Sequence, residues 1–244
     1  MSEERESRSL APLGTTPRDV GVIIVAGGSG SRMGGDELKQ FRWVAGKPML
    51  LHSVQTFMAR PDVGMVVCVL PQQYAGDPPP WLFQCDVDRL LVSIGGRTRS
   101  ESVANGLDDL PDEAQIVLVH DAARPLVGME TIDRVVEAVR AGTPAIAALP
   151  VVDTLKETTE DGTIVRTVDR TSLWRAQTPQ GFPRTLLVEA HRRAREERIT
   201  ATDDAALCER LGHVVRVVRG SERALKVTEP GDFDRVEALY PMQE

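Results

Sequence analysis

The segment AGGSGSRMG at residues 26–34 has the composition of a loop that binds phosphate groups. Gly27, Gly28 and Gly30 let the backbone come close to a ligand and turn its amide groups toward an anion. Two well-known phosphate loops do not match. No Gly-Lys-Ser/Thr sequence follows, and the spacing after Gly30 departs from GxGxxG. The charged residues nearby therefore decide how this loop is interpreted.

Two cations accompany the loop: Arg32 lies inside it, and Lys39 follows seven positions later. A planar guanidinium and a compact ammonium can both face a bound triphosphate and neutralise a leaving pyrophosphate. The plain alternative is a tight turn with two surface cations. The combination of glycine amides and paired cations favours a nucleoside triphosphate site.

Two further segments bring polar residues to predicted strand ends. Asp121 in HDAARP follows a buried strand, where a carboxylate could orient Mg²⁺ or its waters; the alternative is a capping Asp beside an Arg salt bridge. Gly95 and Gly96 in GGRTRSESV could shape a ligand pocket or simply make an ordinary strand-to-helix turn. His120 is better explained as a packed strand-end residue than as a base.

The elements that must position these residues alternate between strand and helix. This order predicts a doubly wound, mostly parallel α/β sheet of the Rossmann-like nucleotidyltransferase kind, with ligands beyond the carboxyl ends of the strands. A nicotinamide dinucleotide site would need an acidic residue at the end of the second strand. This chain has Leu70-Pro71 there. The predicted strands are residues 20–26, 65–70, 90–94, 116–119, 145–151 and 214–218, and the predicted helices are residues 48–60, 100–110, 130–141, 183–197, 204–211 and a last one from 230.

Residues 152–180 break the alternation with a Thr-, Val- and charge-rich stretch around an Asp161-Gly162 turn. We expect a projecting β-arm at about residues 152–175, which would pack on a second subunit because an isolated hairpin is marginal in water. Residues 1–18 are predicted to be a disordered leader, and residues 19–244 a single domain.

Composition narrows the class of protein. A net charge of −7 and a pI near 5.3 argue against a general nucleic-acid binder. No apolar run is long enough to span a bilayer and no signal sequence is visible, so we expect a cytoplasmic protein without membrane contact. Cys68, Cys85 and Cys208 have no metal-binding spacing and are expected to be buried thiols.

Several blocks, in order, carry a family resemblance: GGSGSRMG followed by LKQF, then GGRTRSESV, HDAARP, TVDR with TPQGF, and ALKVTEP. Together they resemble the 2-C-methyl-D-erythritol 4-phosphate cytidylyltransferases of the non-mevalonate isoprenoid pathway, over residues 22–240. One departure is visible, since the family usually opens with Pro-Ala-Ala-Gly and this chain has Val25-Ala26-Gly27-Gly28.

The resemblance implies transfer of CMP from CTP to methylerythritol phosphate, with release of pyrophosphate and no covalent enzyme intermediate. It implies a homodimer in which Arg170 reaches the neighbouring subunit's site, and Mg²⁺ or another divalent cation held mainly by the triphosphate and water, with Asp121 nearby. The implied residues are Arg32 and Lys39 at the transition state; Ala26, Gly27, Gly28, Gly30, Gly96, Arg97, Ser102, Asp121 and Ala122 around CTP; Thr154, Arg124, Thr178 and Thr202 around the acceptor; and Arg170 and Lys226 aiming its phosphate.

The nearest alternative is a ribitol 5-phosphate cytidylyltransferase, which shares the loop and a similar HDA-x-RP block; TVDR favours the methylerythritol enzyme. A pterin guanylyltransferase would explain the loop but neither GGRTRSESV nor TVDR. Outside this class stand a dinucleotide-dependent oxidoreductase, disfavoured by the missing acid, and an inactive nucleotide-binding partner, disfavoured by the presence of both Arg32 and Lys39.

Overall fold

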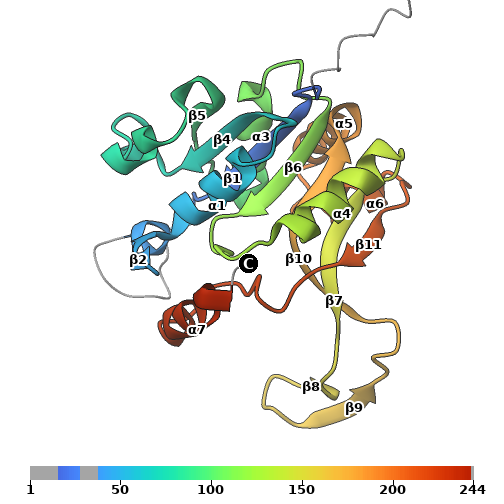
Figure 1. Ribbon diagram of the computed structural model, residues 1–244. Helices are drawn as coiled ribbons and strands as arrows, with labels where there is room; N and C mark the ends of the chain where they lie inside the picture. Colours follow the sequence, from blue (N-terminus) through green and yellow to red (C-terminus); the bar gives the residue numbers. More distant parts are fainter. Residues whose placement is uncertain (1–15, 28–37, 243–244) are drawn as a thin grey trace, which may run out of the picture.

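The computed structural model describes residues 16–27 and 38–242, and its centre is a seven-stranded sheet in the order β11-β7-β10-β6-β1-β4-β5 (Figure 1). All neighbouring pairs are parallel except those made by β10. This confirms the predicted mostly parallel α/β fold. The strands are β1 (Val20–Val25), β4 (Val63–Leu70), β5 (Leu90–Ile94), β6 (Ile116–Asp121), β7 (Ala145–Pro150), β10 (Trp174–Pro183) and β11 (Arg216–Arg219).

The centre of the sheet brings Ala26 and Gly27, the described start of the glycine-rich segment, next to the HDAARP segment. Strand β1 lies between β4 and β6, and its apolar, β-branched residues are buried on both faces. Val25, the last residue of β1, is in register with Asp121, the last residue of β6. Because the two strands are parallel, the loops that follow them leave the sheet at the same edge.

Strand β10 was not predicted as a sheet strand. The arm was expected at about residues 152–175 with no sheet strand after it before residue 214, but β10 returns to the sheet and runs antiparallel between β6 and β7. The sequence signal is weak because this strand contains Pro179 and Gly181 among polar residues. A Cβ at Gly181 would lie only 2.5 Å from Val135 Cγ1, so the missing side chain is what lets α4 pack closely on this strand.

Helices cover both faces of the sheet and form two cores (Figure 1). One core joins α1 and α4 to the alternate residues Val20, Val22 and Ile24 of β1. The other joins α3, α5 and α6 to the opposite face, where Ile23 points. The helices are α1 (Met49–Met58), α3 (Arg99–Asp109), α4 (Met129–Arg140), α5 (Arg184–Glu196) and α6 (Asp204–Arg210), each within a few residues of its predicted bounds.

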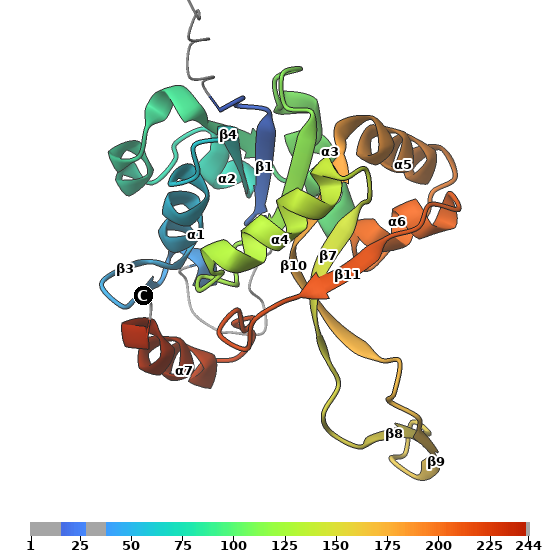
Figure 2. The same cartoon turned by 45° about the vertical axis from the view of Figure 1, so that its right-hand side comes forward.

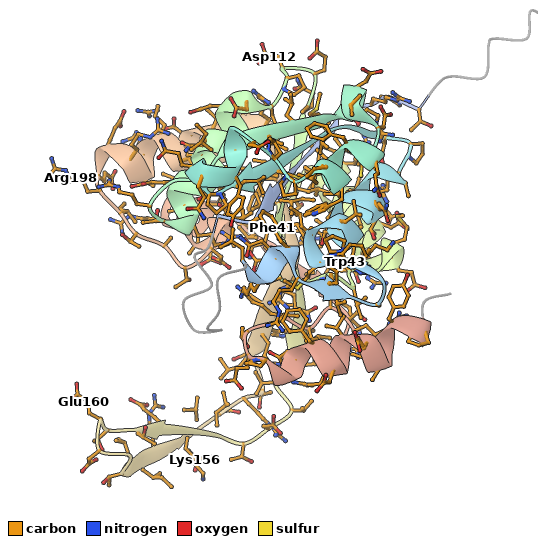
Figure 3. The ribbon with its side chains drawn as sticks, turned by 90° about the vertical axis from the view of Figure 1, so that its left-hand side faces the viewer. Phe41, Trp43, Asp112, Lys156, Glu160 and Arg198 are labelled. Atoms are coloured by element: carbon orange, nitrogen blue, oxygen red, sulfur yellow. The ribbon has the colours of Figure 1, made fainter. Side chains whose placement is uncertain are left out.

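A third, smaller core lies below the carboxyl edge of the sheet, where the closing helix α7 (Gly231–Leu239) packs on the segment after the glycine-rich loop. Val44, Met49 and Phe233 contribute to it. Figure 3 shows Phe41 and Trp43 on this segment, on the side of the body above α7. The remaining short elements are η1 (Lys39–Phe41), β2 (Trp43–Val44), β3 (Lys47–Pro48), α2 (Gln72–Ala75), η2 (Pro80–Gln84), η3 (Val87–Arg89) and η4 (Tyr240–Met242).

The predicted arm is a two-stranded hairpin, β8 (Leu155–Thr158) with β9 (Ile164–Val168), that projects away from the body beyond β7 and β10 (Figure 2). Figure 3 shows Lys156 and Glu160 on this hairpin, far from the layered body. Gly162 has φ +84°, a conformation that favours glycine in the turn. Val152, Ile164 and Val165 are each more than half exposed.

The predicted leader, residues 1–18, lies almost wholly outside the described residues. Among those described, no helix is long and apolar enough to cross a bilayer. Cys68 and Cys208 are buried as expected, whereas Cys85 is only half-buried. Burial raises the pKa of the Cys208 thiol to about 12, so this thiol is neutral and unreactive near pH 7.

Candidate functional site

A pocket of about 480 Å³ opens at the carboxyl edge of the sheet, where the loops after β1, β5 and β6 meet. Its wall combines backbone from small residues with lysine and arginine side chains. Of the residues predicted to bind CTP, it gathers Ala26, Gly27, Gly96, Arg97, Ser102, Asp121 and Ala122, together with Lys39 and Lys226.

Close contact between the first two loops depends on missing side chains. A Cβ at Gly27 would lie 3.1 Å from Ser102 Oγ, and one at Gly95 would lie 3.1 Å from the Leu70 carbonyl oxygen. At Gly96 it would lie 2.3 Å from Glu101 Cβ. The glycines at 95 and 96 therefore let the loop after β5 approach Gly27 closely.

The start of α3 is fixed from within the same loop. Thr98 caps the helix, its Oγ1 accepting from the Glu101 amide at 3.0 Å. The Ser102 hydroxyl donates to the Thr98 carbonyl at 2.9 Å and accepts from the Gly96 amide at 3.1 Å. The 11-residue helix α3 thus begins at the pocket with Gly96 and Ser102 held in one geometry.

Asp121 is the one carboxylate among the described residues that line this pocket, and two cations hold it. Its Oδ1 accepts from Arg99 Nε at 3.2 Å and its Oδ2 from Lys226 Nζ at 2.8 Å. Burial alone would raise the pKa of Asp121, but the charges of Arg99 and Lys226 outweigh it and hold that pKa well below its usual range. The carboxylate is therefore ionised at any pH near neutrality.

The two lysines come from opposite ends of the chain. Lys39, at the start of η1, donates to the carbonyl oxygen of Val227 at 3.0 Å, and Val227 is the residue that follows Lys226. Next to Lys39, buried Gln40 donates to the Ala26 carbonyl. Lys226 lies in the loop between β11 and α7 and not in a strand, and although its side chain is 43% exposed, its ammonium group contacts Asp121. These contacts tie the first and last loops together at the pocket.

Behind Asp121, a buried hydroxyl and a buried imidazole fix the end of β6. Thr178 Oγ1 accepts from the Asp121 amide at 3.1 Å and lies 2.9 Å from His120 Nδ1. His120 Nε2 lies 3.2 Å from the Arg124 carbonyl oxygen, so Nε2 carries the proton and Thr178 donates to Nδ1. Burial lowers the pKa of His120 to about 4, which keeps the ring neutral and agrees with its predicted packing role.

The residues predicted around the acceptor are more scattered within one chain. Arg124 lies in a second pocket of about 290 Å³ that shares Lys226 with the first and also contains Arg175. Thr154 is exposed near the base of the arm, and Thr202 is exposed just before α6. Arg170, also exposed, donates to the Val152 carbonyl at the arm's base. Gly28, Gly30 and Arg32 lie outside the described residues.

Comparison with known proteins identifies the family. The sequence profile of the 2-C-methyl-D-erythritol 4-phosphate cytidylyltransferase family matches residues 20–241. The chain belongs to this family. It is 43% identical to the cytidylyltransferase of that name from Streptomyces coelicolor over 239 residues, covering 93% of this chain and 86% of the relative. The cytidylyltransferase from Syntrophus aciditrophicus is 39% identical over 226 residues, covering 91% and 96%.

The fold agrees with this membership. A crystal structure of 2-C-methyl-D-erythritol 4-phosphate cytidylyltransferase from Thermus thermophilus superposes with a TM-score of 0.77 and 36% identity, over 91% of this chain and 99% of that one. The doubly wound sheet of this cytidylyltransferase family is therefore the fold seen here.

Three residues in or behind the pocket of this cytidylyltransferase-family chain were not predicted from the sequence: Arg99 and Gln40, which line it, and Asp204, which lies behind it. Arg99 stands two positions after Arg97, and only its place at the start of α3 turns it toward Asp121, while Arg97 pairs with Glu101 on the surface. Gln40 and Asp204 contact residues far away in the sequence, so spacing gave no signal. The one local signal was Thr98, a residue type favoured as a helix N-cap, which places Arg99 in the first turn of α3.

Proposed function

We propose that this chain transfers CMP from CTP to 2-C-methyl-D-erythritol 4-phosphate, giving 4-diphosphocytidyl-2-C-methyl-D-erythritol and pyrophosphate. The observation that carries the proposal is the pocket at the ends of β1 and β6, which Lys39 and Lys226 line together with Gly27 and Asp121 in a chain of this family. An acceptor phosphate oxygen attacks the α-phosphorus in line, and pyrophosphate leaves.

Positioning and charge stabilisation would supply the catalysis. Lys39, together with Arg32, stabilises the charge that develops on the phosphate oxygens. The loops at Gly27 and Gly96 approach closely enough for backbone groups to contact the cytosine and ribose, and Ser102 accepts from the Gly96 amide and so holds the second loop in place. No general base is needed, since the attacking phosphate monoester is already anionic, and neutral His120 takes no part in proton transfer.

The acceptor phosphate would sit between the two pockets. Lys226 lines both, and the second is also lined by Arg124, Arg175 and Arg235, of which Arg175 pairs with Glu222 and Arg235 with Asp232. Arg124 and Lys226 are therefore the cations proposed to meet the anionic group. In this proposal Lys226 leaves Asp121 for the acceptor phosphate, while Arg99 continues to pair with Asp121. Thr154, Thr178 and Thr202 are proposed acceptor contacts, although Thr178 already uses its hydroxyl inside the protein.

Magnesium, or another divalent cation, is the proposed cofactor. When bound, it would neutralise part of the triphosphate charge. The described residues contain no cluster of three His, Cys, Asp or Glu side chains, and both oxygens of Asp121 are occupied by cations. A bound metal would therefore be held by phosphate oxygens and water, and Asp121 would reach its hydration shell with the oxygen that Lys226 leaves.

The proposed assembly is a homodimer joined by the β-arm, with residues 19–244 as one domain in each subunit. The arm presents exposed Val152, Ile164 and Val165 and has no core of its own, which favours burial against a second copy. Arg170 would then reach the partner's pocket. A cytoplasmic location remains a prediction.

The decisive experiment supplies CTP and Mg²⁺ with methylerythritol phosphate in one reaction and ribitol 5-phosphate in another, and measures pyrophosphate. Release with the methylerythritol substrate alone is expected. Release with ribitol phosphate alone would replace the proposed acceptor, and release with neither would overturn the reaction.

A further inference from the structure

A line of hydrogen-bonded side chains, Asp121, Arg99, Asp204 and His191, runs from the pocket into the protein behind it. Arg99 Nε donates to Asp121 Oδ1 at 3.2 Å, and Arg99 Nη1 donates to Asp204 Oδ2 at 2.7 Å. The other oxygen of Asp204 accepts from His191 Nε2 at 2.9 Å. Asp121 is part of the proposed site, whereas Asp204 and His191 do not line the pocket.

Asp204 and His191 are too buried to serve as a surface ion pair. Asp204 is 1% exposed and His191 is 5% exposed. Burial alone would raise the pKa of Asp204, but Arg99 and His191 outweigh it and hold that pKa below its usual value, so the carboxylate is ionised. A buried carboxylate without such partners would strongly destabilise the folded protein, so Asp204 must stay paired with Arg99.

The backbone around Asp204 is also anchored. Gln180 Oε1 accepts from the amides of Asp204 and Ala205, each at 3.2 Å, and Gln180 Nε2 donates to Asp203 Oδ2 at 2.8 Å. Gln180 lies in β10, hydrogen-bonded to β6 opposite Val119, two residues before Asp121. Asp204 is therefore fixed relative to the strand whose end carries Asp121.

The planar guanidinium of Arg99 thus donates to two carboxylates, those of Asp121 and Asp204, and the second is held in a fixed position. With only Asp121 as a partner, the long Arg99 side chain could adopt several rotamers and Asp121 would follow it. With Asp204 on Nη1, the guanidinium has a single orientation, so the carboxylate of Asp121 keeps one orientation when Lys226 moves to the acceptor. We propose that Asp204 and His191 are positioning residues that act through Arg99 on Asp121. This inference rests on the proposed function.

The test compares Asp204→Asn, Arg99→Gln and the double variant in steady-state assays with CTP and methylerythritol phosphate. Each single variant should lower kcat by about tenfold to a hundredfold, the range seen when the outer partner of a functional group is removed, with a smaller change in KM for CTP. The double variant should be no slower than Arg99→Gln alone, since Asp204 acts only through Arg99.

Asp62→Asn is the matched control. Asp62 is 5% exposed and accepts from Arg60 at 3.0 Å and Arg140 at 3.1 Å, but it precedes β4 at the opposite edge of the sheet. Removing its charge should lower the melting temperature as Asp204→Asn does and leave kcat unchanged. A loss of kcat in Asp62→Asn equal to that in Asp204→Asn would mean that general destabilisation explains both.

A second pair of variants covers the case in which Asp204→Asn does not fold. His191→Gln keeps an N–H donor for Asp204 and should retain most of kcat, whereas His191→Leu removes it and should lose activity. Equal kinetics for these two variants, or multiplied losses in the Asp204–Arg99 double variant, would overturn the positioning role. If instead the wild-type chain releases no pyrophosphate with CTP and methylerythritol phosphate, the proposed function itself fails.

Discussion

At the scale of single residues, Lys39 is the described cation on which the proposed transition state depends most. Lys39→Ala should lower turnover by on the order of a hundredfold or more, because one preorganised charge at the phosphates is removed. The matched control is Lys47→Ala, since Lys47 donates to Gln55 at 2.6 Å and does not line the pocket. Wild-type turnover in Lys39→Ala would remove this residue from the mechanism.

His120 predicts a pH dependence of stability. The ordinary pKa of 6.5 applies in the unfolded chain, and the folded value of about 4 is lower, so the unfolded state binds more protons between these values. The stabilisation by neutral His120 is complete above about pH 6.5 and is lost as pH falls toward 4. The loss is on the order of 3 kcal/mol. Urea unfolding at pH 7 and pH 4.5 measures it.

The comparison variant for this prediction is His120→Gln, which cannot titrate in that range. Its free energy of unfolding should fall less than that of the wild-type protein between the two pH values. Equal slopes for both proteins would show that other groups, such as His52, whose pKa burial also lowers, cause the change.

The sequence predicted the site at this scale only where residues are near one another in the chain or belong to a known motif. Gly27, Gly96, Ser102 and Asp121 were predicted to be together, and the structure brings them to one pocket. The ion pairs of Arg99 with Asp121 and Asp204 link positions 22 and 105 residues apart, so no local pattern reveals them. Contact between distant residues is set by the sheet order.

At the scale of elements, Gly181 is a position where a small change should weaken the fold without touching the pocket. In Gly181→Ala the new methyl would lie 2.5 Å from Val135 Cγ1 and 3.0 Å from Val139 Cγ2, so α4 must shift away from β10. Such overpacking destabilises by about 1–3 kcal/mol. Thermal unfolding should show a lower Tm than in Gly76→Ala, where a Cβ meets nothing within 4 Å.

Most elements were predictable because apolar runs and helical spacing are local signals, as in β5, whose bounds match the prediction at both ends. Strand β10 was not predicted because it lacks such a local signal. Its partners β6 and β7 supply its apolar environment, and its own sequence, WRAQTPQGFP, carries no alternation. Its conformation is decided by pairing with β6 on one side and with β7 on the other.

At the scale of the whole molecule, shared sites in an arm-linked dimer make a quantitative prediction. Arg170→Ala should mainly raise KM for methylerythritol phosphate, with Arg166→Ala as control, because Arg166 pairs with Glu157 within the hairpin at 2.6 Å. If each arm serves the partner's pocket, mixing Lys39→Ala and Arg170→Ala subunits restores one intact site per mixed dimer, or about a quarter of wild-type activity at equal amounts, measured at an acceptor concentration far below the raised KM.

The mixing experiment has a clear opposite outcome. If each arm serves its own pocket, mixed dimers contain two defective sites and no activity returns. Full activity of a monomer, measured at concentrations where sedimentation detects no dimer, would likewise rule out a shared site.

The position of β10 has a consequence for how the chain reaches its native state during synthesis. In the described sheet, β7 pairs only with β10 and β11, both of which follow it in sequence. A nascent chain that ends before residue 174 therefore has β1, β4, β5 and β6 able to pair, while β7 has no strand to join. The arm must therefore be synthesised before β10 can join β6 to β7 and complete the sheet. A shortened chain that contains the complete sheet thus also contains the arm.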